Sequence, residues 1–262
     1  MPSSWSDAFV LNALVLLLAV ALDLLLPEPP AIVHPVVWMG KAISAFERVA
    51  PAGPVAGLFF GCAVVIVIVG ISGGIAWLAM TALGAVGPVA YVIGGVVMLR
   101  ISFTVRGLVS AAGRTRRALE GGHLDEAKES LQSLVSRDAE DLSASLVAAA
   151  AIESVAENTT DSFIAPWLAF AVFGVPGAVA FRAINTLDSM LGTRGRYEYF
   201  GKTAARLDDV VNMIPARLSA LLLLISGGFG RLPLARGWRT MLRDRHLTAS
   251  SNAGWTMGAM AG

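Results

Sequence analysis

Long hydrophobic runs alternate with short polar blocks along this chain of 262 residues. The apolar runs cover residues 9–26, 58–83, 89–105, 163–184 and 211–226. A helix needs about 20 consecutive apolar residues to cross the hydrocarbon core of a bilayer. The pattern therefore predicts an all-α fold, a polytopic membrane helix bundle with four to five apolar segments in a single integral membrane domain over residues 1–262.

The boundaries of these runs indicate how the chain turns. A tight turn is expected at Gly84–Pro88, between the second and third runs. The fourth run is broken near its middle at Pro176, which predicts a broken or re-entrant segment. A single crossing there would place the basic block Arg194–Arg206 outside the cell, whereas basic loops tend to remain in the cytoplasm. The later basic stretch Arg231–Arg245 is amphipathic and is expected to lie on anionic lipid.

Residues 106–145 interrupt the apolar pattern and read as a soluble insert. Helices expected at Leu108–Leu119 and Leu124–Val135 flank a break at Gly121–Gly122, so the insert is predicted to be a helical hairpin. Several arginines follow directly on the third apolar run, namely Arg106, Arg114, Arg116 and Arg117. By the positive-inside tendency, this insert and the active face of the protein are expected in the cytoplasm.

The segment Pro27–Gly40 contains four prolines, which exclude a regular helix and predict a stiff, extended segment at the membrane surface. It carries His34, which is either a structural hydrogen-bonding group or a contact for substrate. The following stretch, Lys41–Arg48, reads as a short amphipathic helix. Arg100 lies inside the third apolar run and is expected to snorkel toward the surface rather than to bind an anion.

Composition supports a membrane protein and excludes some classes of site. The chain is 55% hydrophobic and 15% charged, whereas soluble domains are roughly a quarter charged. A formal net charge of +1 gives no indication of nucleic-acid binding, so no nucleic-acid partner is expected. The single cysteine, Cys62, excludes an intrachain disulfide and a cysteine metal cluster, and it is expected to be a buried small hydrophobic residue.

A helix predicted across Ala148–Pro166 carries the first candidate site. Glu153, Glu157 and Asp161 follow one another at intervals of four residues, which places them along one face of a regular helix. Like charges at this spacing repel each other. A metal ion, another cation or nearby arginines are therefore expected to balance them.

Three polar clusters adjoin the apolar runs: Glu153, Glu157, Asn158 and Asp161; Asn185 and Asp188; and Arg206, Asp208, Asp209 and Asn212. Oxygen ligands without cysteine or a histidine pair suit Mg²⁺, which commonly uses one or two carboxylates together with substrate phosphates. The predicted metal ligands are Glu153, Glu157, Asp188, Asp208 and Asp209. Arg194 and Arg206 would clamp phosphate oxygens. The alternative is a set of ordinary interfacial charges.

Five segments of the chain resemble the adenosylcobinamide-phosphate synthase family, also called CobD or CbiB. They occur in the order of the family and cover most of the chain after its first apolar run. The segments are DLLLPEPPAIVHPVVWMG (Asp23–Gly40), LVSRDAEDL (Leu134–Leu142), AIESVAENTTDSFIAP (Ala151–Pro166), INTLDSMLG (Ile184–Gly192) and RLDDVVNMIPARLSAL (Arg206–Leu221).

The resemblance implies an enzyme of cobalamin biosynthesis in the bacterial cell (inner) membrane. Family members use ATP and Mg²⁺ to join aminopropanol, usually as its phosphate, to the remaining propionate carboxylate of adenosylcobyric acid. The product is adenosylcobinamide or its phosphate. The implied partners are these two substrates, the lipid bilayer and other membrane proteins of the corrinoid pathway.

On this resemblance the candidate residues take roles. Glu153, Glu157 and Asp161 are the catalytic candidates, which bind Mg²⁺–ATP or take the proton of the amine. Residues expected to bind substrate are His34, Asn158, Asn185, Arg194, Arg206 and Asn212. Family chains continue beyond a segment similar to Ser251–Gly262 with a further apolar stretch, so the C-terminus is expected to be shortened.

Two other functions fit charged residues beside broken membrane helices. One is an Mg²⁺-dependent intramembrane prenyltransferase, although the paired Asp-rich helices typical of that class are not found in the sequence. The other is a transporter or a corrinoid-handling scaffold, although no internal inverted repeat is visible.

Overall fold

The computed structural model describes residues 5–135, 141–192, 198–248 and 250–262, and every regular element in these ranges is helical. Three helical stretches are long and apolar enough to cross a membrane: Asp7–Leu25, Pro54–Val86 and Ala144–Leu191. A fourth crossing is possible if the helices Glu198–Val211 and Met213–Phe229, which meet at a bend of 50°, count as one span. The prediction of a helical membrane bundle is confirmed.

The helices form two compact units. Unit 1 comprises the described residues of Met1–Thr104 and Ala165–Val211. Its elements are α1 (Trp5–Leu25), the short 3-10 helix η1 (Ala31–Val33), α2 (Pro35–Arg48), α3 (Pro54–Val86), α4 (Pro88–Arg100), α8 (Ala165–Leu191) and α9 (Glu198–Val211).

Unit 2 comprises Val105–Ile164 and Asn212–Gly262, again for the residues described. Its elements are α5 (Arg106–Glu120), α6 (Leu124–Gln132), α7 (Ala144–Thr159), the π-helical turn η2 (Thr160–Ile164), α10 (Met213–Phe229), α11 (Leu234–Asp244) and α12 (Ala253–Ala261). The hairpin predicted around Gly121–Gly122 is confirmed, since α5 and α6 flank these two residues.

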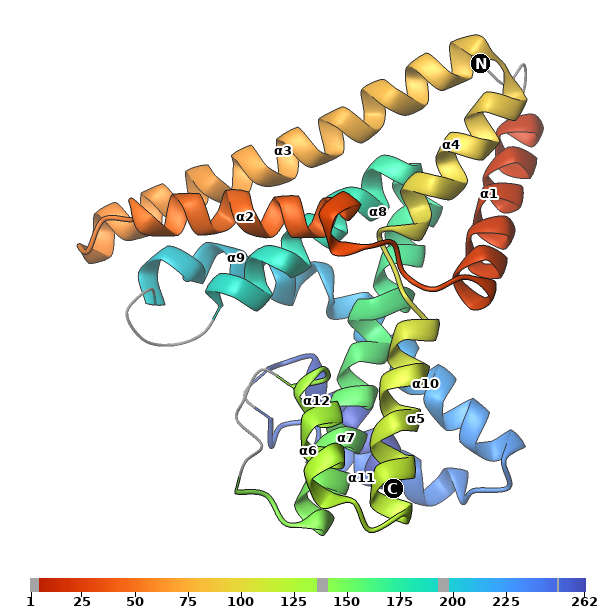
Figure 1. Cartoon of the computed structure of the whole chain (residues 1–262), viewed down its shortest axis with the longest axis vertical. Coiled ribbons are helices and arrows are strands. Elements are labelled where there is room, and N and C mark those ends of the chain that lie inside the picture. The colour runs from red at the N-terminus through yellow and green to blue at the C-terminus, as the bar shows by residue number, and fades with distance from the viewer. Residues whose placement is uncertain (1–4, 136–140, 193–197, 249) are drawn as a thin grey trace. The chain divides into compact units, whose positions relative to one another are not determined.

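Unit 1 is organised around α3, which packs against α8 and α9, while α1 packs beside α4 (Figure 1). The core between these helices contains Val64 of α3, Leu187 of α8 and Phe200 of α9, together with Ile43 of α2. The turn predicted at Gly84–Pro88 is shorter in the structure, because α3 continues to Val86 and α4 begins at Pro88. Gly87 alone joins the two helices, and it has φ +149°, a backbone conformation that favours glycine.

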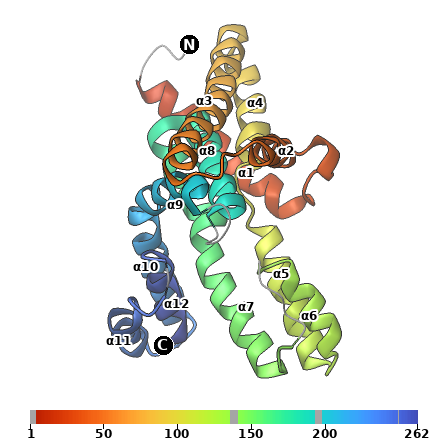
Figure 2. The same cartoon turned by 90° about the vertical axis from the view of Figure 1, so that its left-hand side faces the viewer.

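Unit 2 contains two helical groups. The hairpin of α5 and α6 packs with α7 around fully buried Leu131 and Val147. Helices α10, α11 and α12 pack together around Met241 and Ala220 (Figure 2). The segment after Asn252 is therefore a folded part of unit 2, because α12 buries its small residues against α10 and α11.

Two predicted boundaries are wrong. The proline-rich segment was expected to exclude helix as far as Gly40, but α2 begins at Pro35. Proline is well tolerated at the first position of a helix, where its missing N–H would find no partner within the helix. The third apolar run was expected to extend to residue 105, but α4 ends at Arg100 and its 13 residues fall short of a full crossing.

The expected break in the fourth apolar run is present inside α8. Gly174 has φ +66° and ψ −161°, which is outside the helical region, and Pro176 follows two residues later. A second irregularity precedes α8, because the chain forms a π-helical turn at Thr160–Ile164 rather than a regular α-helix. The helix predicted to run evenly through Asp161 therefore changes its pitch at Thr160, one residue earlier.

Candidate functional site

The first part of the candidate site lies where α4 meets the proline-rich segment in unit 1. Arg100 is only 9% exposed, and its Nη2 donates hydrogen bonds to the carbonyls of Leu26 at 2.8 Å and Pro27 at 2.6 Å. The expectation that Arg100 snorkels to the surface is therefore wrong. Carbonyls freed by the end of α1 and by the prolines provide acceptors inside the protein, so the guanidinium remains buried.

A second arginine, Arg182 of α8, extends this cationic region. Its Nε donates to the carbonyl of Ser102 at 2.8 Å, and its Nη1 donates to Oδ1 of Asn185 at 3.1 Å. Asn185 is 8% exposed and lies one helical turn further along α8. The side chain of Asn185, predicted to bind substrate, is thus oriented by Arg182.

His34 lies in the electrostatic range of both arginines and of Glu28. Its Nδ1 accepts a hydrogen bond from the backbone N–H of Val36 at 3.3 Å, so it caps the first turn of α2. Burial lowers the pKa of His34 below its usual 6.5, Glu28 acts against this, and Arg182 and Arg100 lower the pKa further. The structural role considered for His34 is confirmed, and contact between His34 and a substrate stays a prediction.

Lowering the pH from neutrality through 6.5 is expected to destabilise the fold through His34. Below 6.5 the unfolded chain binds a proton at His34 while the folded chain still resists it, so stability present above 6.5 is lost as the pH falls toward the lower folded pKa. The melting temperature in detergent, measured across this range, should fall less steeply for His34→Asn, because asparagine keeps a helix cap and does not titrate. The exposed His246→Asn serves as the control and should keep the wild-type slope; equal slopes for both variants would contradict the assignment.

The acidic part of the site lies at the end of α8 and on α9. Asp188 follows Asn185 by three residues on α8, and its carboxylate is near enough to Asp209 of α9 for the two charges to interact. Arg206 lies 3.7 Å from Asp209 through its Nη1, and its side chain is 77% exposed. The structure thus brings together Asn185, Asp188, Asp209 and Arg206, four of the residues that were predicted from separate polar clusters. Asp208 lies beside Asp209 on the same helix.

The carboxylates of the first predicted cluster belong to unit 2. Glu153 is exposed, and Glu157 and Asp161 are partly buried on α7 and η2. The predicted substrate residue Asn158 is fixed within its own helix, where its Nδ2 donates to the carbonyl and to Oγ of Ser154 at 2.9 and 3.0 Å. π-helical turns occur frequently at functional sites, so the turn that contains Asp161 is consistent with a role there.

Three sequence predictions for the site are either not tested by the structure or are corrected by it. Arg194 lies outside the described residues. Asn212 was expected to share one continuous helix with Asp208 and Asp209, but α9 ends at Val211, and Asn212 occupies the break before α10 with 2% exposure. The convergence of the α7 carboxylates with the α8–α9 residues stays a prediction, since they belong to different units.

Within the described ranges, no three His, Cys, Asp or Glu side chains gather in a way that could hold a metal ion. Mg²⁺ commonly uses only one or two protein carboxylates, with substrate phosphates as further ligands. Asp188 and Asp209 fit that mode, because they are two neighbouring carboxylates on adjacent helices and offer only oxygen ligands. Their mutual repulsion favours a cation between or beside them.

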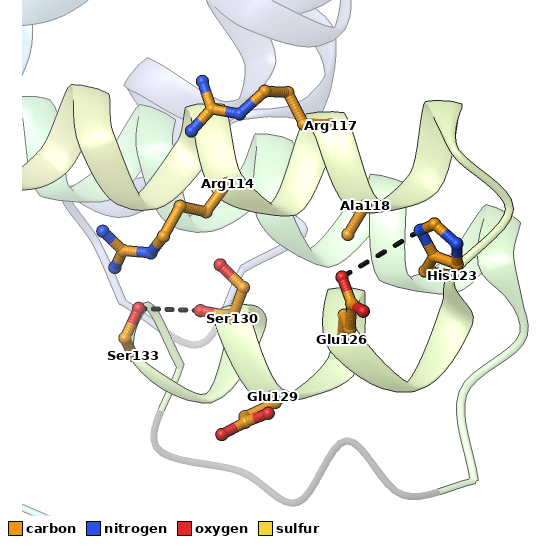
Figure 3. Close-up of a pocket in the computed structure, with 8 residues that line it drawn as sticks. All are labelled: Arg114, Arg117, Ala118, His123, Glu126, Glu129, Ser130 and Ser133. Atoms are coloured by element: carbon orange, nitrogen blue, oxygen red, sulfur yellow. Dashed lines mark hydrogen bonds and ion pairs between the residues drawn. The ribbon is translucent and has the colours of Figure 1, made fainter.

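A separate cleft lies between α5 and α6 in unit 2, with a volume of about 650 Å³ (Figure 3). In Figure 3 the guanidinium of Arg114 lies on the side of Ser133, while His123 faces Glu126, 4.0 Å away. The lining carries both signs of charge, on arginine, histidine and glutamate side chains. We therefore regard this cleft as a surface feature and place the candidate site on α8 and α9.

Sequence reasoning missed Arg182. It lies within an apolar run whose other residues directed attention to the break at Pro176. A lone arginine inside an apolar helix was itself the available signal, because such residues generally face a protein interior or a cavity. Arg100 gave the same signal, and in both cases the structure shows the guanidinium bound to backbone carbonyls.

Comparison with known proteins gives consistent matches. The family model described as CobD/Cbib protein matches residues 16–262. The chain is 44% identical over 250 residues to the cobalamin biosynthesis protein CobD of Dehalococcoides mccartyi, which covers 95% of this chain and 81% of the relative. It is 40% identical over 249 residues to the protein of the same name from Geobacter metallireducens, with 95% and 78% covered. No solved structure matches the chain.

Proposed function

Because the chain belongs to the CobD/Cbib family, we propose that it acts in cobalamin biosynthesis as an ATP-dependent ligase, an adenosylcobinamide-phosphate synthase. The proposed reaction joins the amine of aminopropanol phosphate to the remaining propionate carboxylate of adenosylcobyric acid. Each organic substrate carries an anionic group, a carboxylate or a phosphate, and the cytoplasmic face of the bacterial inner membrane is where ATP is available to them. The enzyme would therefore need cations for the substrates and a base for the amine.

One observation carries this proposal, namely the polar face of α8. Arg182, Asn185 and Asp188 follow one another at intervals of three residues, and α8 carries no other charged side chain besides Arg182 and Asp188. Such residues are costly in a membrane segment and usually mark the path of a substrate or ion. Arg100 and His34 extend this face at one end, and Asp209 and Arg206 extend it at the other.

The cationic end of this face suits an anionic group of a substrate. Arg100 and Arg182 hold their guanidinium groups in place through backbone carbonyls, so little side-chain entropy remains to be lost on binding. Among the described residues, Nε of Arg100 is a buried donor without an acceptor in the protein. Buried polar groups are generally hydrogen-bonded, and an oxygen of the substrate would satisfy this nitrogen.

The chemistry of amide formation assigns tasks to the acidic residues. A propionate carboxylate gains the terminal phosphoryl group of ATP, which leaves ADP and an acyl phosphate. The neutral amine then attacks the carbonyl carbon, inorganic phosphate leaves, and a carboxylate takes the proton that the amine loses. Glu157 and Asp161 are the proposed bases, and Arg206 would stabilise the negative charge on the departing phosphate.

The donor set fits Mg²⁺, and Asp188 and Asp209 are the residues that would hold it. The ion would supply charge neutralisation for the phosphate oxygens of ATP. Asp208, which lies beside Asp209 on α9, is the other proposed ligand. Arg206, 3.7 Å from Asp209, balances part of the carboxylate charge in the protein itself.

A direct test uses the purified chain in detergent with ATP, Mg²⁺, adenosylcobyric acid and aminopropanol phosphate. Mass spectrometry should detect the amide product, and ADP should form in equal amount only when both organic substrates are present. Glu157→Gln, which keeps the size of the side chain, should lose at least about 100-fold of this rate if Glu157 is the base.

A different result would favour another function. Uptake of a labelled corrinoid into vesicles that contain the chain, without ADP or amide formation, would support a transporter and overturn the ligase proposal. The transporter is the alternative to test because α8 is broken at Gly174, and broken membrane helices also occur at transport sites.

A further inference from the structure

An apolar groove of about 370 Å³ lies between α10 and α11 in unit 2. Its walls are formed by Leu221 and Ile225 of α10 and by Leu234 and Trp238 of α11. All four side chains are between 42% and 52% exposed, so the groove is open at the protein surface. Ala235 also lines the groove, and among the described residues that line it Arg239 alone is charged.

The location of the groove indicates hydrocarbon rather than water as its surroundings. Helix α10 belongs to the bent helix pair that is long and apolar enough to count as a membrane crossing. Exposed aliphatic residues also precede and follow α11 in the sequence, with Leu232 at 66% and Leu247 at 81% exposure. Exposed apolar side chains of this kind are typical of protein that contacts lipid.

Helix α11 separates its side chains into three faces. Gly237 and Met241 are buried against the rest of unit 2. Leu234, Trp238 and Leu242 follow at intervals of four residues and form the exposed apolar face. The remaining face carries arginines, which are Arg236, Arg239 and Arg243. A helix with an apolar face next to an arginine face lies in the interface of a membrane, with its cations at the level of the lipid phosphates.

We propose that the α10–α11 groove binds one acyl chain of an anionic phospholipid, whose headgroup phosphate is held by Arg239. The apolar walls provide the surface for the chain, and Arg239 lies at the point where the chain would meet its headgroup. Trp238 suits the same position, because tryptophan prefers the boundary between hydrocarbon and headgroups. The proposal is independent of the ligase reaction.

Native mass spectrometry of the full chain, purified in detergent and titrated with phosphatidylglycerol or phosphatidylcholine, tests this assignment. The wild-type chain should retain phosphatidylglycerol more strongly than phosphatidylcholine. Arg239→Gln should weaken phosphatidylglycerol binding about five-fold, which is the effect expected of one basic side chain near anionic lipid. It should weaken phosphatidylcholine binding less, because the choline cation already balances the phosphate charge of that lipid. Ala235→Trp should fill the groove and weaken the binding of both lipids.

Arg243→Gln is the matched control. It removes the same charge from the same helix, but Arg243 is bound to Asp244 at 2.6 and 2.7 Å and does not line the groove. Phosphatidylglycerol binding should therefore change less than two-fold in this variant. Equal losses in Arg239→Gln and Arg243→Gln, or unchanged lipid binding by a folded Ala235→Trp chain, would overturn the proposal. Circular dichroism of each variant checks that its helix content is unchanged.

Discussion

Asp188→Asn is expected to lower the rate of ATP-dependent amide formation by at least about 100-fold. The substitution keeps the shape of the side chain and its position on α8 but removes the negative charge. That charge lies near Asp209, and together the two carboxylates are the proposed holders of the ion that accompanies the ATP phosphates. Without the charge of Asp188 the site is less negative and binds the ion more weakly, so nucleotide affinity and the rate of phosphoryl transfer should both fall.

The assay is the coupled measurement of ADP and amide product, carried out at several Mg²⁺ concentrations. Substitution of a residue that holds Mg²⁺ should raise the concentration of Mg²⁺ needed for half-maximal rate, whereas substitution of a purely structural residue should not. Glu129→Gln provides the control, because Glu129 is an exposed carboxylate beside the α5–α6 cleft. Wild-type activity in Asp188→Asn, or a comparable loss in Glu129→Gln, would move the site away from α8.

Local chemistry accounts for the parts of the fold that the sequence predicted well. The hairpin of α5 and α6 follows from two amphipathic stretches separated by Gly121–Gly122, and the turn at Gly87 follows from a glycine–proline pair between two apolar runs. In both places the conformational preferences of glycine or proline determine where a helix ends and the chain turns. The start of α2 was missed for a related reason, because the same proline that ends one helix can begin another.

The irregular parts depend on interactions that one sequence does not reveal. The segment Thr160–Ile164, which forms the π-helical turn, contains no proline or glycine that would indicate an irregular helix. The spacing of Glu157 and Asp161 therefore predicted a regular helix. The burial of Arg100 depends on carbonyls of Leu26 and Pro27, which lie more than 70 residues earlier in the chain. Both the π-helical turn and the burial of Arg100 are therefore determined by tertiary packing rather than by local propensity.

In the candidate site, too, the sequence predicted the local arrangement of residues but not their tertiary contacts. Helical spacing identified Asn185 and Asp188, and it identified Asp209 and Arg206 as a separate cluster. Their proximity follows from the packing of α8 on α9, which brings residues about 20 positions apart to one place. Arg182 was hidden because a single charge barely alters the apolar character of a long run. The structure identifies it through its two hydrogen bonds.

Gly201→Ala is expected to destabilise unit 1 by about 3 kcal/mol and to abolish most amide formation, because it adds atoms where none fit. A Cβ at Gly201 would lie 1.7 Å from the carbonyl oxygen of Leu191, and backbone cannot move aside as a flexible side chain can. The contact joins the end of α8 to α9, a few residues from Asp188. Separating the helices would therefore disturb the acidic pair as well as the core around Phe200.

Gly70→Ala on α3 is the matched control, since a Cβ there would meet nothing within 4 Å. Alanine is favoured over glycine in a helix by roughly 0.5–1 kcal/mol, so this variant should be as stable as the wild type or slightly more stable. Melting temperature in detergent and the amide assay measure both variants. If the Gly201→Ala chain had the same melting temperature as the Gly70→Ala chain and kept its activity, α8 and α9 would not be in contact at Leu191. The proximity of Asp188 and Asp209 would then have no structural basis.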